Sequence, residues 1–189
     1  ASALGLLHEG EAFTTTVMRR RQLRVDIPAW RHALINFPHP LLKSGLVILD
    51  TPGLNALGSE PELTVSMIPN AHAVLFLLAT DTGVTASDLA LWEKYVQGRV
   101  PRSIVVLNKI DLLWDDLKSE AEIASELERQ IVDTARTLDL SREHVIPLSA
   151  QKALVARVRG DEAMIVKSRV RDLESLLAEE IIPAKQEIL

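Results

Sequence analysis

Polar residues that could hold a ligand follow three short apolar runs in this sequence. They are Asp50 after Leu46-Val-Ile-Leu49, Asn108-Lys-Ile-Asp111 after Ile104-Val-Val-Leu107, and Ser149-Ala150 after Val145-Ile-Pro-Leu148. Such runs, bounded by turn residues, are typical of buried strands in a parallel sheet. In α/β sheets, ligands bind at the carboxyl ends of the strands. The pattern therefore predicts one binding site that is built from several strand ends.

The stretch Asn108-Lys-Ile-Asp111 resembles the Asn-Lys-x-Asp motif with which GTPases recognise guanine. The carboxylate of Asp111 can accept two N–H donors from the Watson–Crick edge of guanine, a pair that adenine lacks. Asn108 can bond the edge of the base and tie neighbouring loops together, and the stem of Lys109 can lie over the base plane. Ser149-Ala150 is similar to the last motif of these enzymes, in which a backbone N–H meets the guanine oxygen. The resemblance thus implies that GTP or GDP is bound.

The stretch Asp50-Thr51-Pro52-Gly53 is similar to the phosphate-sensing turn of the same enzymes. In those enzymes the aspartate helps to hold Mg²⁺. The resemblance implies that Asp50 does so through water. Gly53 would let its backbone N–H approach the γ-phosphate, because no Cβ blocks the way. The alternative is an ordinary buried strand that leaves through an Asp-Thr-Pro-Gly turn.

Further stretches narrow the resemblance to the dynamin-like GTPases, especially the bacterial kind. They are Asp50-Thr-Pro-Gly-Leu-Asn55, Ala56-Leu-Gly-Ser-Glu-Pro-Glu-Leu63 and Asp81-Thr-Gly-Val-Thr85. The resemblance covers the chain from about Trp30 onward. It implies an α/β fold, the three-layer P-loop GTPase (Ras-like) fold, and GTP hydrolysis with Mg²⁺.

One family motif, the P-loop Gly-x-x-x-x-Gly-Lys-[Ser/Thr], is missing, since none of the 8 glycines is followed by lysine. We therefore expect a fold that is incomplete at its N-terminus and a chain that is inactive by itself. The catalytic residues are left unassigned, because the P-loop and the switch threonine are expected outside this chain.

Several elements must position these residues. We expect strand-like residues at 13–17, an antiparallel strand pair at 31–37 and 46–50, and a buried strand at 71–79. We also expect a helix that starts at the capping box Thr85-Ala-Ser-Asp88, a long amphipathic helix over 117–138, and a final helix from about Ser168. Residues 152–167 fit no single element and contain a break at Gly160-Asp161. Pro183 either ends the last helix or bends it.

The whole chain, residues 1–189, is expected to be one partial dynamin-type GTPase domain. Residues 1–29 are a poorly defined N-terminal segment, and 168–189 form a helix that leads towards a helical region outside the chain. By resemblance, the partners are a guanine nucleotide, a second copy that docks through the GTPase face, and membrane lipid that other regions contact. Two alternatives stay open: an Era-like GTPase associated with ribosomes or assembly, and a nucleotide-free scaffolding domain with a GTPase fold.

Composition excludes several other classes of function. The net charge of −5 argues against a general nucleic-acid binder, and the absence of cysteine excludes disulfides and thiolate zinc sites. The hydrophobic content of 47% suffices for a sizeable core. No apolar run approaches the ~20 residues of a membrane span. We therefore expect a cytoplasmic protein, or one that is peripheral on the cytoplasmic membrane.

Overall fold

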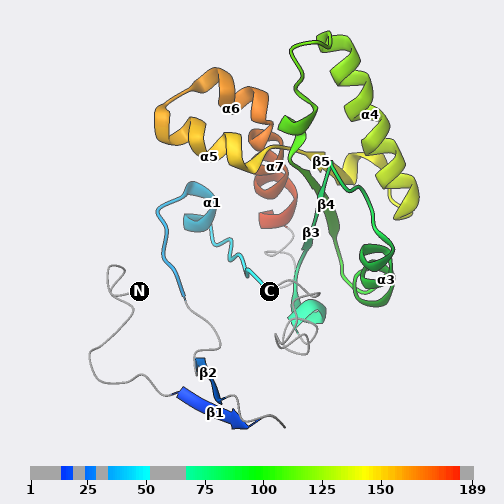
Figure 1. The fold of residues 1–189 in the computed structure, drawn as a ribbon. Helices are drawn as coiled ribbons and strands as arrows, with labels where there is room; N and C mark the ends of the chain where they lie inside the picture. The colour runs from blue at the N-terminus through cyan, green and yellow to red at the C-terminus, as the bar shows by residue number, and fades with distance from the viewer. Residues whose placement is uncertain (1–13, 19–23, 29–33, 52–66, 184–189) are drawn as a thin grey trace. The chain divides into compact units, whose positions relative to one another are not determined.

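The computed structural model describes residues 14–18, 24–28, 34–51 and 67–183 (Figure 1). The chain divides into two units, Ala1–Pro38 and His39–Leu189. In the first unit, strands β1 (Thr14–Met18) and β2 (Arg24–Pro28) pair antiparallel, with Thr16 opposite Asp26. The strand-like character expected at 13–17 is therefore confirmed for the described part of that segment.

The second unit contains a parallel sheet whose strands stand in the order β3-β4-β5. The strands are β3 (Val74–Ala79), β4 (Ser103–Asn108) and β5 (Val145–Pro147). The α-helices are α1 (Pro40–Lys43), α3 (Ala86–Tyr95), α4 (Glu120–Thr137), α5 (Ala150–Arg159), α6 (Glu162–Ser168) and α7 (Val170–Leu176). Shorter turns are η2 (Ile68–Asn70), η3 (Ile110–Leu113), η4 (Arg142–His144) and the π-helical turn η5 (Leu177–Ile181). Each step from one strand to the next passes through a helix, as parallel pairing requires.

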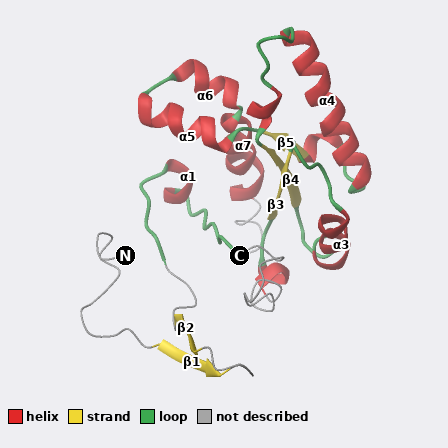
Figure 2. Cartoon of the chain, in the orientation of Figure 1, coloured by secondary structure: helices red, strands yellow, loops and turns green. Residues whose placement is uncertain are grey.

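Helices cover both faces of this sheet (Figure 2). Alternate side chains of a strand point to opposite faces, so each strand contributes to two cores. On one face, Leu78, Val105 and Leu107 pack with residues of α3 and α4. On the other face, Leu75 and Ile104 pack with residues of α7 and η5. The prediction of a three-layer α/β fold is confirmed by this arrangement.

Trp92 of α3 fixes the first of these cores. It is only 1% exposed, and its ring meets Phe76 of β3 edge-on, with 5.3 Å between the ring centroids. Its indole Nε1 donates a hydrogen bond of 3.1 Å to the carbonyl of Leu138, at the end of α4. One side chain therefore joins a strand to both helices on its face of the sheet.

The helix boundaries follow the local signals of the sequence. The capping box predicted at Thr85 and Asp88 is formed at the start of α3, and a second one, Ser119 with Glu122, starts α4. The break expected at Gly160-Asp161 separates α5 from α6, because Gly160 takes a left-handed conformation with φ of 70°. The final helix begins at Val170, just after Arg169, whose φ is 60°. Within the described residues, no helix combines the length and the apolar content that a bilayer crossing needs.

The strand pair expected at 31–37 and 46–50 is wrong for the residues that the structure describes. Residues 34–39 have no regular structure, and Pro40 starts the short helix α1 instead. Leu46–Asp50 is not part of the sheet, and Val47, Ile48 and Leu49 are 77%, 61% and 54% exposed. A strand forms only where a neighbouring edge completes its hydrogen bonds, and none of the described strands pairs with this run. Apolar composition alone was an insufficient signal.

We predict that Trp92→Phe destabilises the protein by about 1–3 kcal/mol, because the carbonyl of Leu138 loses its buried donor. Trp92→Ala should cost about 3–5 kcal/mol, since it also leaves a cavity. Urea unfolding followed by far-ultraviolet circular dichroism measures both. Leu117→Ala, at a side chain that is 94% exposed, is the control and should lie within about 0.5 kcal/mol of the parent. Equal stability of Trp92→Phe and the parent would contradict this role.

A second prediction concerns pH and the start of α4. Hydrogen bonds from the hydroxyl and the N–H of Ser119 lower the pKa of Glu122. A lowered carboxyl pKa stabilises the fold above the unfolded pKa of about 4.3. That stabilisation is lost as the pH falls through the lower folded pKa. Glu122→Gln should therefore lower the melting temperature at pH 7 more than at pH 3. Glu120→Gln, in the same helical turn, should show a smaller pH dependence, and identical profiles for the two variants would contradict the assignment.

Candidate functional site

The loops after β4 and β5 are held together by backbone hydrogen bonds. The N–H of Leu148 donates to the carbonyl of Leu107 at 3.0 Å, and the N–H of Ile110 donates back to the carbonyl of Leu148 at 3.3 Å. These bonds continue the parallel ladder beyond the ends of both strands. The two sequence motifs that follow the strands therefore lie side by side.

The side chain of Asn108 joins the two motifs directly. Its Oδ1 accepts a hydrogen bond from the N–H of Ala150 at 3.0 Å and another from the N–H of Lys109 at 2.7 Å. The residues are far apart in sequence, and this bond sets the distance between their loops. The tying role that the sequence predicts for Asn108 is present in the structure. With Oδ1 used in this way, the Nδ2 amino group is the donor that can meet a ligand.

Residues at the end of β3 hold the backbone and side chain of Lys109, and sequence reasoning did not assign them to the site. Lys109 has a left-handed backbone with φ of 67°. This conformation is unfavourable for most residues other than glycine. The buried Thr80 supports it, because its Oγ1 donates to the carbonyl of Lys109 at 2.8 Å. The ammonium Nζ of Lys109 lies 3.1 Å from a carboxylate oxygen of Asp81. Their position in the sequence could have identified them, since Thr80 and Asp81 follow an apolar strand just as the motif residues do.

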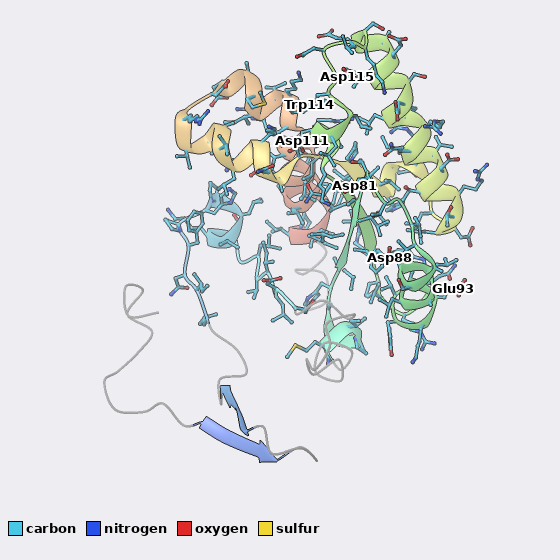
Figure 3. The ribbon with its side chains drawn as sticks, viewed as in Figure 1. Asp81, Asp88, Glu93, Asp111, Trp114 and Asp115 are labelled. Carbon is cyan, nitrogen blue, oxygen red and sulfur yellow. The ribbon has the colours of Figure 1, made fainter. Side chains whose placement is uncertain are left out.

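Asp111 lies in η3, the turn that follows Lys109 (Figure 3). Its neighbour Ile110 is 2% exposed and anchors the turn in the core. Among the described residues, the carboxylate of Asp111 forms no ion pair, so its acceptor positions are open to a ligand. Trp114 closes the turn with a hydrogen bond from its N–H to the carbonyl of Asp111 at 3.2 Å. The ammonium of Lys167, on α6, lies 4.5 Å from the centroid of the Trp114 ring. This cation–π interaction links the loop to α6.

Ser149 and Ala150 have separate structural tasks. Ser149 is fully buried, its hydroxyl accepts from the N–H of Lys152 to cap α5, and its own N–H donates to the carbonyl of Ser168. Its polar groups are therefore used within the protein. The N–H of Ala150 is the one that points towards Asn108. A guanine oxygen would have to share that N–H with the Asn108 carboxamide.

The residues expected on the phosphate side lie outside the sheet or outside the described residues. Asp50 and Thr51 are exposed and lie in the irregular segment after Leu49, while Pro52 and Gly53 fall outside the described residues. Among the residues that the structure describes, no three acidic or histidine side chains converge on a metal position. A single carboxylate is nonetheless compatible with Mg²⁺, which proteins often bind through one or two carboxylates together with substrate phosphates. The structure thus brings together Asn108, Lys109, Asp111, Ser149 and Ala150, whereas Asp50 lies in an exposed irregular segment.

Comparison with known proteins identifies the family. A profile described as the dynamin family matches residues 11–110, which is more than half of the chain. The chain belongs to the dynamin family. The matched region runs from the first unit through β4 to Ile110 and includes Asn108 and Lys109. Membership in this family favours the dynamin-like interpretation over the Era-like alternative.

Individual relatives agree with this assignment. A bacterial dynamin-like protein of Nostoc punctiforme is 27% identical over 144 residues, which cover 70% of this chain and 21% of that protein. A probable chloroplastic transmembrane GTPase, FZO-like, of Arabidopsis thaliana is 31% identical over 124 residues, covering 64% of this chain and 13% of that protein. This dynamin-family chain therefore spans only a small part of the length of these relatives.

A partial structural likeness to Era of Aquifex aeolicus, a structure bound to GDP.AlF4-, was also found. It has 20% identity and a TM-score of 0.36, and it covers 57% of this chain and 32% of that one.

We predict that Asn108→Ala frees the loop after β5. The amide of Ala150 loses its acceptor, so its hydrogen exchange should accelerate about 3- to 10-fold, the effect of one net hydrogen bond. Exchange measured by NMR resolves this single amide. Asp81→Asn is the matched control, because it removes the ion pair with Lys109 and leaves the Asn108 carboxamide in place. Unchanged exchange at Ala150 in Asn108→Ala would show that the carboxamide does not hold the two loops together.

Proposed function

We propose that this chain forms the base-recognising part of a dynamin-family enzyme that binds and hydrolyses GTP. The observation that carries the proposal is the Asn108 carboxamide, whose oxygen holds the two motif loops and whose amino group is left to donate. Family membership and the names of the relatives support the same activity.

Each residue has a definite task in this proposal. The Nδ2 group of Asn108 donates to a ring nitrogen on the edge of the base, and Asp111 accepts the two N–H donors of guanine. The aliphatic stem of Lys109 lies over the base plane, and its ammonium is already paired with Asp81. The N–H of Ala150, fixed by the cap at Ser149, meets the guanine oxygen. Adenine offers neither that oxygen nor the same donor pair, so the site selects guanine.

For the phosphate side of the site, the proposal rests on the chemistry of the side chain of Asp50 and the backbone of Gly53. Asp50 would hold Mg²⁺ through water, and Gly53 would bring a backbone N–H to the γ-phosphate. When bound, Mg²⁺ supplies the charge neutralisation on which phosphoryl transfer depends. No glycine of this chain is followed by lysine, so the amides and lysine of a P-loop must come from other polypeptide. The complete protein would be a peripheral membrane enzyme. Its partners would be a second copy, which docks through the GTPase face, and membrane lipid, which other regions bind.

We also propose that residues 1–189 are part of one GTPase domain. The helix from about 168 would lead into a helical region. The described part of that helix reaches Pro183, and residues 184–189 lie outside the described residues. A proline there either ends the helix or makes a hinge.

We predict that residues 1–189 alone bind GTP only weakly and do not hydrolyse it measurably. P-loop amides and lysine hold the phosphates in enzymes of this kind, and the base contacts remain without them. Isothermal titration calorimetry with GTP and with guanosine tests this, and the two affinities should be similar. Micromolar binding of GTP with much weaker binding of guanosine would mean that this chain holds phosphates by itself. No guanosine binding at all would favour the nucleotide-free scaffolding domain.

We also predict a change of base preference in the complete protein. Asp111→Asn should lower GTP affinity at least 100-fold, since two charge-assisted hydrogen bonds are lost. It should raise the affinity for XTP, because xanthine places an acceptor where guanine has its amino group. Competition binding against a fluorescent nucleotide measures both. Asp115→Asn, four residues further along the same loop, is the matched control and should keep the GTP preference. An unchanged preference for GTP in Asp111→Asn would show that Asp111 does not bind the base.

A further inference from the structure

Three consecutive residues, Lys167, Ser168 and Arg169, form the corner between α6 and α7 (Figure 1). None of them lies in the sequence motifs described above. Lys167 nevertheless contacts the loop after β4, and Ser168 contacts the loop after β5. One short corner therefore contacts both of the loops that carry the candidate base-binding residues.

The contact with the loop after β5 fixes the peptide group that precedes Ala150. The N–H of Ser149 donates to the carbonyl of Ser168 at 2.9 Å. The carbonyl of the same peptide group, that of Leu148, accepts from the N–H of Ile110 at 3.3 Å. A peptide group is planar, so hydrogen bonds at both of its ends fix its orientation. The next N–H along the chain is that of Ala150.

The direction of the Ser168 carbonyl depends on the backbone of Arg169. Arg169 takes a left-handed conformation with φ of 60°, and its N–H donates to the carbonyl of Val166 at 3.0 Å. The fully buried hydroxyl of Ser168 donates to the carbonyl of Ile165 at 2.6 Å. A residue that does not tolerate the left-handed conformation would turn the peptide group after Ser168, and the carbonyl of that group would move away from the loop.

The contact with the loop after β4 is made by the side chain of Lys167. Its ammonium lies 4.5 Å from the centroid of the Trp114 ring. The N–H of Trp114 donates to the carbonyl of Asp111 at 3.2 Å, so a shift of Trp114 moves the turn that carries the Asp111 carboxylate. The contact lies at the surface, where a cation–π interaction changes an equilibrium constant about 2- to 5-fold.

We propose that this corner positions the two groups that recognise guanine. Ser168 and Arg169 direct the N–H of Ala150 towards the guanine oxygen, whereas Lys167 directs the carboxylate of Asp111 towards the guanine N–H donors. The inference rests on the proposed function, because it assigns positioning residues to that base site. Since the two contacts reach different loops, loss of one should impair recognition of one part of the base and spare the other.

The test is the binding of three nucleotides to the complete protein, measured by competition against a fluorescent nucleotide. GTP carries every group that the site would recognise. In 6-thio-GTP, sulfur replaces the guanine oxygen and is a weaker acceptor, and ITP lacks the amino group. The ratio of GTP affinity to 6-thio-GTP affinity therefore reports on the N–H of Ala150. The ratio of GTP affinity to ITP affinity reports on the carboxylate of Asp111.

Two substitutions of Arg169 isolate the backbone conformation, because Arg169→Val and Arg169→Gly both remove the ion pair with Asp172. Glycine takes a positive φ without strain, whereas a β-branched residue there is an outlier. Arg169→Val should lower the GTP to 6-thio-GTP ratio about 3- to 10-fold, the effect of one hydrogen bond. It should leave the GTP to ITP ratio unchanged, and Arg169→Gly should keep both ratios. Equal ratios in the two variants would overturn the proposal.

Lys167→Gln tests the other loop. It should lower the GTP to ITP ratio about 2- to 5-fold and keep the GTP to 6-thio-GTP ratio. Lys94→Gln is the matched control, because the ammonium of Lys94 lies 4.9 Å from the centroid of the Tyr95 ring, on a helix that carries no residue of the base site. It should keep both ratios. An equal loss of affinity for all three nucleotides in Lys167→Gln would show that the corner only stabilises the fold, and it would overturn the proposal.

The amide of Ser149 gives a readout that needs no nucleotide. In residues 1–189, its hydrogen exchange, measured by NMR, should accelerate about 3- to 10-fold in Arg169→Val and stay unchanged in Arg169→Gly. Unchanged exchange in Arg169→Val would overturn the proposal. A complete protein that binds the three nucleotides equally would overturn the proposed function, and the role of the corner in recognition with it. Parental ratios in every variant would overturn the role of the corner alone.

Discussion

The position of the candidate site depends on the hydrogen bond between the Asn108 carboxamide and the N–H of Ala150. Loops after neighbouring parallel strands have no covalent reason to stay together, because a whole helix separates them in sequence. The strand ladder brings them close, and the carboxamide sets their final distance. The oxygen that holds the loops and the amino group that can read a base belong to one planar group. Binding chemistry and loop geometry are thus determined by the same side chain.

The left-handed backbone of Lys109 shows what keeps this arrangement in place. The Lys109–Asp81 ion pair is about half exposed on both sides, and such pairs contribute about 0–1 kcal/mol. Thr80 is buried, and its hydroxyl bonds the carbonyl of Lys109 inside the protein, where an unmade hydrogen bond is costly. The backbone conformation is therefore held mainly from β3 through Thr80. Asp81 has the smaller task of pairing with the ammonium.

Sequence patterns predicted the elements whose signals are local. The strands β3, β4 and β5 were predicted because each is an apolar run closed by turn residues, and α3 was predicted from its capping box. The run at Leu46–Asp50 has the same composition, and its assignment as a strand was wrong because a strand also needs an edge to pair with. Thr80 was missed for a related reason. Its importance comes from the contact with Lys109, across a sheet register that spacing along the chain does not reveal. Ser149 lies where the motif places it, but its hydroxyl caps a helix.

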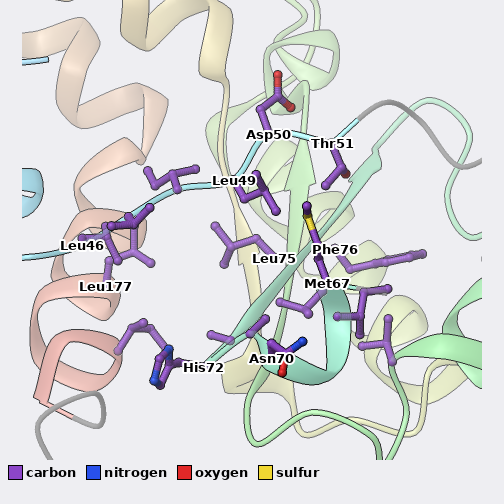
Figure 4. A pocket seen from close by; sticks show the side chains of 18 of the residues that line it. Leu46, Leu49, Asp50, Thr51, Met67, Asn70, His72, Leu75, Phe76 and Leu177 are labelled. Atoms are coloured by element: carbon purple, nitrogen blue, oxygen red, sulfur yellow. The ribbon is translucent and has the colours of Figure 1, made fainter. Parts of the chain in front are cut away.

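The two halves of the candidate site differ in what they require. The base side is built on β4 and β5, and the apolar residues of β4 from Ile104 to Leu107 are at most 3% exposed. The phosphate side begins at Asp50, directly after the exposed residues Val47 to Leu49, and this segment lines an apolar pocket together with β3 (Figure 4). Burying those side chains would stabilise that segment by about 25 cal/mol for each Å² of apolar surface covered. The base side is thus organised by the buried strands of the sheet, whereas the segment that leads to Asp50 is exposed and irregular among the described residues.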